Sequence, residues 1–174
     1  GYATEFQQAL AEINLTMTSP SEGVQRYVSS WYRLDQLYRK FIYHMQKSGQ
    51  ASLLADLYAS VENRYTNSFV LALNDAWQDQ IAGLDEWKIP GFASQTDFYR
   101  DQAAEYRRKD QKVAVIISDA FRFEVGEECL RRIRALDRFD AELKTMISAV
   151  PSYTQLGMAA LLPHGTLSLA EDGS

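Results

Sequence analysis

The period of the hydrophobic pattern changes once along this chain, at Lys112, and that change restricts the fold more than any other feature. Before it, apolar residues recur every three or four positions, as they do on one face of an α-helix. After it comes a continuous, largely β-branched run at residues 113–117 (VAVII), which is typical of a strand buried in a parallel sheet. The sequence therefore predicts a helical region at residues 1–110 and the N-terminal part of an α/β domain at residues 111–174.

The helical region has recognisable helix ends. Ser19 places a hydroxyl at a cap position and Pro20 follows at the first helical position, so a long helix is expected to begin there. Gly49 is placed to end that helix. The helices predicted from the period cover residues 3–13, 20–48, 52–81 and 96–109.

The second and third of these helices carry apolar, aromatic stripes joined by a short polar turn, which predicts a helical hairpin. Two interpretations of the stripes remain open. If Trp31, Tyr38 and Trp77 are exposed, the hairpin is a surface that docks partner proteins. If all three are buried, the stripe is core, and this is the interpretation we prefer.

The α/β part follows the order strand, helix, strand. Helical spacing resumes at residues 123–133, a second extended segment is expected at residues 140–150, and another helix at residues 154–162. This order predicts a βαβ unit with parallel strands. The fold class expected for the whole chain is α/β, with a helical N-terminal region.

Two polar residues follow the two predicted strands. Asp119 ends the first strand and Thr154 opens the helix after the second, and ligands of parallel sheets bind at such strand ends. A carboxylate there suits a divalent cation, and a threonine hydroxyl becomes a nucleophile when a base or metal ionises it. The helix N-terminus would favour a phosphoryl group beside Thr154. Helix capping is the alternative role for each residue.

The residue strings 113–124 (VAVIISDAFRFE) and 150–163 (VPSYTQLGMAALLP) closely resemble the PglZ family, whose domain belongs to the alkaline phosphatase superfamily. The resemblance is good over residues 98–163. It implies a metal-dependent site with two divalent cations, zinc or manganese, and a covalent phosphoenzyme intermediate. Carried over to this sequence, it makes Asp119 a metal ligand and Thr154 the metal-bound nucleophile.

Arg122 and Glu124 belong to the same motif. The resemblance allows Arg122 to face a phosphate and Glu124 to orient a ligand, while a surface ion pair is the alternative for both. The remaining Asp and His ligands of such sites come later in the chain. His44 is expected on the surface of a helix and His164 in a loop, and neither is expected to bind metal.

The resemblance also implies a biological setting. PglZ proteins belong to BREX phage-defence systems and work beside an adenine methyltransferase and an ATPase. We therefore predict a phosphatase or phosphodiesterase, including a nuclease, in a longer parent protein, and an inactive fragment that binds no metal by itself. The alternative is a helical protein-interaction module without catalysis. A haloacid dehalogenase site would need a second Asp where Phe121 stands, and no Gly-rich turn suggests a nucleotide-binding loop.

Composition adds exclusions. The formal charge of -5 argues against general polyanion binding by this stretch, although a longer protein could still contact nucleic acid. Cys129 is the single cysteine, which excludes an internal disulfide, and it is expected to be buried. No apolar run approaches the roughly 20 residues that span a membrane. A cytoplasmic location is predicted. The missing initiator Met further suggests a fragment.

Overall fold

The computed structural model describes residues 1–50 and 52–168. The chain forms two compact units. The helical unit consists of Gly1–Leu84 and Arg122–Ala141, and the strand unit consists of Asp85–Phe121 with the described part of Glu142–Ser174. This division into compact units does not test the domain boundary predicted between residues 110 and 111, so that boundary stays a prediction.

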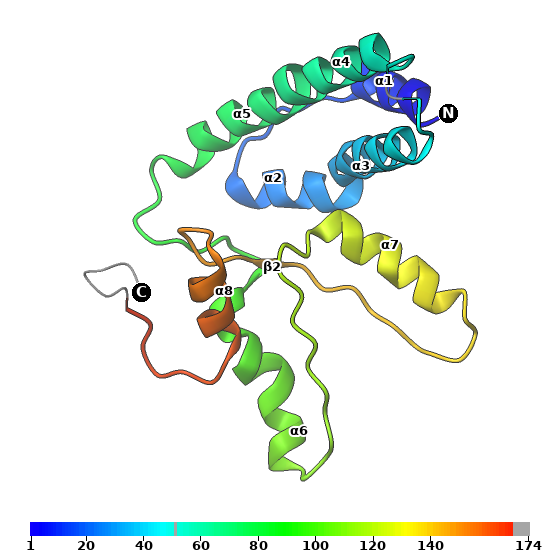
Figure 1. The fold of residues 1–174 in the computed structure, drawn as a ribbon. Coiled ribbons are helices and arrows are strands. Elements are labelled where there is room, and N and C mark those ends of the chain that lie inside the picture. The colour runs from blue at the N-terminus through cyan, green and yellow to red at the C-terminus, as the bar shows by residue number, and fades with distance from the viewer. Residues whose placement is uncertain (51, 169–174) are drawn as a thin grey trace. The chain divides into compact units, whose positions relative to one another are not determined.

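The regular elements described in the helical unit are all helices, and Figure 1 shows α4 and α5 as parts of one long helical run. Two π-helical turns, η1 and η2, join consecutive helices without interrupting the chain's helical course. The described elements are α1 (Tyr2–Glu12), α2 (Pro20–Arg26), η1 (Tyr27–Trp31), α3 (Tyr32–Lys47), α4 (Ala55–Asn63), η2 (Arg64–Leu71), α5 (Ala72–Ile81) and α7 (Phe123–Arg134).

The predicted helix ends are confirmed. Ser19 Oγ accepts a hydrogen bond of 3.1 Å from the Glu22 amide, and Pro20 is the first residue of α2. Both features satisfy or remove donors that a helix start leaves unpaired. Gly49 has a φ of 66°, which lets the chain turn away after α3 because glycine tolerates this region.

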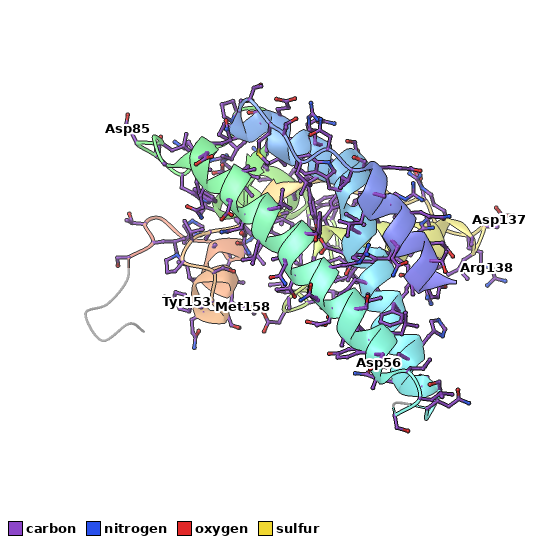
Figure 2. The ribbon with its side chains drawn as sticks, turned by 90° about the horizontal axis from the view of Figure 1, so that it is seen from above. Asp56, Asp85, Asp137, Arg138, Tyr153 and Met158 are labelled. Atoms are coloured by element: carbon purple, nitrogen blue, oxygen red, sulfur yellow. The ribbon has the colours of Figure 1, made fainter. Side chains whose placement is uncertain are left out.

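The aromatic stripes form the core of the helical unit. Trp31 is 3% exposed, and Tyr38 and Trp77 are half-buried against the same core. The fully or nearly fully buried apolar members are Phe6, Met17, Trp31, Leu34, Phe41, Val61 and Phe69. This arrangement favours the core interpretation of the stripes over a docking surface. Figure 2 shows the side chains along these helices as sticks.

Close packing of α2 on α5 depends on one glycine. A Cβ atom on Gly23 would lie 2.6 Å from the Met17 sulfur and 3.2 Å from a ring carbon of Trp77. These distances are shorter than ordinary van der Waals contact, so only glycine fits without a shift of its neighbours. The two helices can therefore approach this closely because glycine has no side chain.

The strand unit contains a two-stranded parallel sheet and short helices. Strand β1 (Ala93–Ser94) pairs with β2 (Met146–Ile147), with Ala93 opposite Met146 and Ser94 opposite Ile147. The helical elements are η3 (Gln95–Asp97), η4 (Tyr99–Ala103), α6 (Ala104–Arg108) and α8 (Thr154–Leu161). Both predicted helices that flank the second strand, α7 and α8, are confirmed.

The predicted first strand is wrong for this structure. Residues 113–117 are irregular, and β2 occupies only two of the eleven positions expected at residues 140–150. The sheet instead pairs β2 with residues 93–94, which were not predicted as a strand. Composition identifies a segment that suits a buried strand, but a strand forms only with a hydrogen-bonding neighbour and cover on its faces. Ile116 is 93% exposed, so that cover is missing here.

The fold is therefore mostly helical with a small parallel sheet, which is compatible with part of an α/β domain. Within the described part of the chain, no helix combines the length and apolar composition needed to cross a membrane.

Candidate functional site

The two predicted site residues meet in the strand unit. Thr154 Oγ1 donates a hydrogen bond of 3.2 Å to Asp119 Oδ2, across 35 positions of sequence. Both side chains are exposed, so a substrate or an ion has access to them. Asp119 follows the irregular segment 113–117, and Thr154 is the first residue of α8. The geometry thus brings a carboxylate and a hydroxyl together at a helix N-terminus.

Thr154 does not cap its helix. Tyr153 occupies the cap position of α8, no side-chain capping hydrogen bond forms there, and Thr154 is the first helical residue. Its hydroxyl is directed to the carboxylate of Asp119 instead of to a backbone amide. The first amides of α8 and its dipole give this end a partial positive charge, which favours an anion beside Thr154.

Asp119 lies in a turn with an unusual backbone. Its Oδ1 atom accepts a hydrogen bond of 3.0 Å from the amide of Ala120, whose φ is 52°. A residue other than glycine is rarely found in this left-handed region, and such residues occur often at functional turns. One carboxylate oxygen is thus engaged by the backbone and the other faces Thr154.

The pair fits part of a divalent metal site. A carboxylate and an ionised hydroxyl are hard oxygen donors of the kind that such cations accept. Two donors do not make a complete ligand set, and the described residues include no group of three or more His, Cys, Asp or Glu residues that could hold an ion. His44 lies on the exposed surface of α3 and stacks on Tyr2, and His164 is exposed in a loop, as expected.

Glu124 and Arg122 belong to the helical unit. Glu124 is fully buried, and its two carboxylate oxygens accept hydrogen bonds of 2.9 to 3.0 Å from Arg39 on α3. Arg122 Nη2 donates a further bond of 3.2 Å to Glu124 Oε1. The ion pair between Arg122 and Glu124 exists, but it is not the surface pair considered from the sequence. Roles in phosphate binding or ligand orientation stay predictions for both.

The interface between α3 and α7 contains a second carboxylate, that of Glu128. Arg39 also binds Glu128 at 2.6 Å, and this hydrogen bond is the main reason that the pKa of Glu128 is lowered to about 2. Nearby, Asp35 accepts hydrogen bonds from the hydroxyls of Tyr27 and Tyr65, and burial together with this carboxylate raises the pKa of both tyrosines. Charge pairing therefore specifies how α7 packs on α3.

One further prediction, about Cys129, is settled by the structure. Cys129 is exposed on α7, so its predicted burial is wrong. The reason is that α7 is covered on one face only, and Cys129 lies off the face that carries Glu124.

Sequence reasoning missed two residues that contact the Thr154 region. Gln95 Oε1 accepts a hydrogen bond of 2.9 Å from the Ala149 amide, and Gln95 Nε2 donates one of 3.2 Å to the Gly157 carbonyl. Trp87 Nε1 donates a bond of 2.8 Å to the Ser148 carbonyl. Neither residue belongs to a motif, and these contacts span more than fifty positions, so no local signal indicated them.

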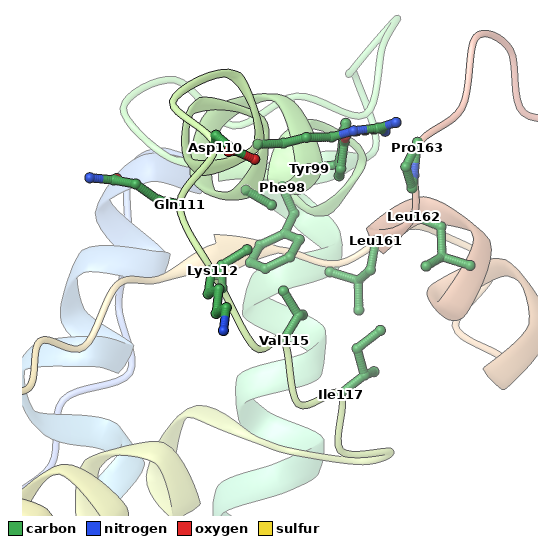
Figure 3. Close-up of a pocket in the computed structure, with 13 residues that line it drawn as sticks. Phe98, Tyr99, Asp110, Gln111, Lys112, Val115, Ile117, Leu161, Leu162 and Pro163 are labelled. Carbon is green, nitrogen blue, oxygen red and sulfur yellow. Dashed lines mark hydrogen bonds between the residues drawn. The ribbon is translucent and has the colours of Figure 1, made fainter.

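An apolar pocket lies elsewhere in the strand unit. Figure 3 shows Phe98, Val115, Ile117 and Leu161 among the residues that line it. Neither member of the Asp119–Thr154 pair contributes to its wall. The pocket is therefore separate from the candidate site. Part of its wall is formed by the segment predicted as a strand.

Comparison with known proteins supports the motif resemblance. Residues 98–174 match the family described as the BREX system PglZ alkaline phosphatase-like domain. The alkaline phosphatase-like protein PglZ of Bacillus cereus (strain H3081.97) is 34% identical over 170 residues, covering 96% of this chain and 20% of that protein. The alkaline phosphatase-like protein BrxZ of Escherichia coli O9:H4 (strain HS) is 38% identical over 148 residues, covering 81% of this chain and 17% of that protein.

The chain thus spans about a fifth of the length of the curated relatives it matches. No solved structure matches it significantly. A helical chain with a small parallel sheet, and with a carboxylate and a hydroxyl beside a helix N-terminus, is compatible with the alkaline phosphatase-like class of proteins. The resemblance to the PglZ family is confirmed by the family match and by both relatives.

Proposed function

We propose that this chain supplies a metal ligand, Asp119, and the nucleophile, Thr154, of a metal-dependent phosphohydrolase. The observation that carries the proposal is the hydrogen bond from the Thr154 hydroxyl to Asp119, made by a residue that opens α8 without capping it. Similarity to alkaline phosphatase-like proteins supports the choice of a hydrolase. The substrate class is a phosphate monoester or diester, nucleic acid included.

Each residue of the pair has a distinct task. Thr154 Oγ1 attacks phosphorus as the bond between phosphorus and the ester oxygen breaks, and the alcohol leaves with the proton that Thr154 gives up. Before that step, Asp119 keeps the hydroxyl turned toward the site through the 3.2 Å bond. Backbone amides in the first turn of α8 stabilise negative charge that develops on the phosphoryl oxygens. Divalent cations, two ions of zinc or manganese, would lower the pKa of the hydroxyl and screen the phosphoryl charge. Their other ligands lie outside the pair.

The proposed setting is a BREX phage-defence system. The family description that matches residues 98–174 names that system, and we propose other BREX components, including the methyltransferase and the ATPase, as partners. A cytoplasmic location stays a prediction. The alternative, a helical module that only docks partners, loses its main support because Trp31, Tyr38 and Trp77 pack in or against the core.

The proposal is tested by two substitutions in a longer protein that contains this sequence. Thr154→Ala and Asp119→Ala should each abolish metal-dependent hydrolysis of p-nitrophenyl phosphate and bis-p-nitrophenyl phosphate, with the circular dichroism spectrum unchanged. Ser152→Ala is the matched control, because Ser152 is an exposed hydroxyl in the same turn, and it should keep full activity. Wild-type turnover by Thr154→Ala would refute the assigned nucleophile.

The 174-residue chain itself should hydrolyse neither ester above background, even with added zinc or manganese, because the described residues supply only part of a ligand set. Metal-dependent turnover by this chain alone would show that the pair suffices and would contradict that expectation.

A further inference from the structure

The turn that leads into α8, residues 150–153, is poorly packed. Val150 is 48% exposed, and Pro151 and Ser152 are exposed as well. The hydrogen bond of 3.1 Å from the Tyr153 amide to the Pro151 carbonyl is internal to the turn. Because the turn is not held by burial, the position of Thr154 depends on how the two ends of the turn are fixed.

One side chain contacts the chain on both sides of the turn. The Gln95 amide accepts a hydrogen bond from Ala149, just before the turn, and donates one to Gly157, three residues after Thr154. A primary amide offers an acceptor and a donor on one planar group, which the two backbone partners require in this order. A carboxylate would lose the donor, and an aliphatic side chain would lose both.

The position of Gln95 is itself fixed by the neighbouring structure. It directly follows β1, whose Ser94 pairs with Ile147 of β2, so the register of the sheet sets where its side chain starts. Ser94 also accepts a hydrogen bond from the Thr96 amide, which orders the η3 turn. The bond from Trp87 to Ser148 fixes the same strand end from a second side chain.

We propose that Gln95 is a positioning residue, which fixes Thr154 Oγ1 against Asp119 by bridging the two ends of the turn. The inference rests on the proposed function, since positioning matters for catalysis only if Thr154 reacts. A displacement of about 1 Å at a reacting atom is enough to reduce turnover strongly. Gln95 precedes residue 98, where the family match begins, so the functional unit extends upstream of the matched domain.

The structural part is tested in this chain by nuclear magnetic resonance. Gln95→Met should remove the proton contact between the side chains of Thr154 and Asp119, and should make the Ala149 amide exchange about fivefold to tenfold faster, as expected for one net hydrogen bond. Gln95→Glu keeps the volume and the acceptor, so the Ala149 amide should stay protected while the Thr154 contact weakens. Gln102→Glu makes the same change on the exposed face of η4 and should alter neither signal.

Persistence of the full Thr154–Asp119 proton contact in Gln95→Met, or in Gln95→Glu if the methionine variant does not fold, would overturn the inference. In a longer active protein, Gln95→Met should lower kcat by about 10-fold to 100-fold and leave KM within about twofold. An unchanged kcat with a lost contact would also overturn the positioning role. Full activity of Thr154→Ala would instead overturn the proposed function, while the measurement in this chain would still decide whether Gln95 holds the turn.

Discussion

Removal of the Arg39 guanidinium is the sharpest test of how the helical unit is held together. Glu124 is fully buried, and Arg39 supplies three of the four side-chain hydrogen bonds to its carboxylate, the fourth coming from Arg122. In the variant Arg39→Met, the methylene packing is largely kept and the compensating charge is lost. The carboxylate then stays buried with a single partner, which is unfavourable because charge is poorly solvated there.

The expected cost follows from this geometry. Breaking a buried ion pair by removing one partner costs about 3–5 kcal/mol. The side chain of Arg39 is 34% exposed and Arg122 remains in place, so we expect a smaller loss of about 2–3 kcal/mol in the free energy of unfolding. For a chain of this size, that loss lowers Tm by about 5–10 °C.

Urea unfolding followed by far-ultraviolet circular dichroism measures this loss. Arg26→Met is the matched control, because its ion pair with Glu22 joins side chains that are 39% and 30% exposed, and it should cost less than about 1 kcal/mol. The double variant Arg39→Met/Glu124→Met should be more stable than the sum of its single variants by more than about 1 kcal/mol. Additive effects within about 0.5 kcal/mol would refute the claim that the two residues form one buried unit.

Two further predictions concern the same unit. Gly23→Val should lower the free energy of unfolding by about 2 kcal/mol, because the valine side chain would meet the Met17 sulfur. Gly83 has open space around it, so Gly83→Val should change the free energy of unfolding by less than about 0.5 kcal/mol in the same urea titration. Because its hydrogen bond with Arg39 holds the pKa of Glu128 at about 2, below the ordinary 4.5, its stabilising contribution is present above pH 4.5 and is lost as pH falls toward 2. Glu128→Gln should therefore flatten the acid side of the stability profile, and an unchanged slope would contradict this.

The helices could be predicted because their signals are local. Each signal acts within a few residues, as do the apolar period, the Ser19 cap and Gly49. The helices of the structure begin and end at the positions that these signals predicted. The strand at residues 113–117 could not be judged in the same way. Its composition suits a sheet, but pairing needs a distant partner, and in this chain β2 pairs with residues 93–94.

The site was predictable only in part for the same reason. Asp119 and Thr154 were identified because both follow segments predicted as strands, and the structure brings their side chains together. Gln95 meets its two partners across 54 and 62 positions, and no periodicity or motif marks such a contact. The buried carboxylate of Glu124 was also unexpected, since a charged residue in a first helical turn is ordinarily solvated and its partner Arg39 lies 85 positions away.

The uncovered segment at residues 113–117 affects any work with the isolated chain. Val113, Val115 and Ile116 are 47%, 46% and 93% exposed, and a run of β-branched residues with free backbone groups is a template for strand addition between molecules. At high protein concentration, we expect two copies to pair through this segment. Sedimentation over a range of concentrations should therefore precede every stability or resonance measurement, so that the properties recorded are those of a monomer.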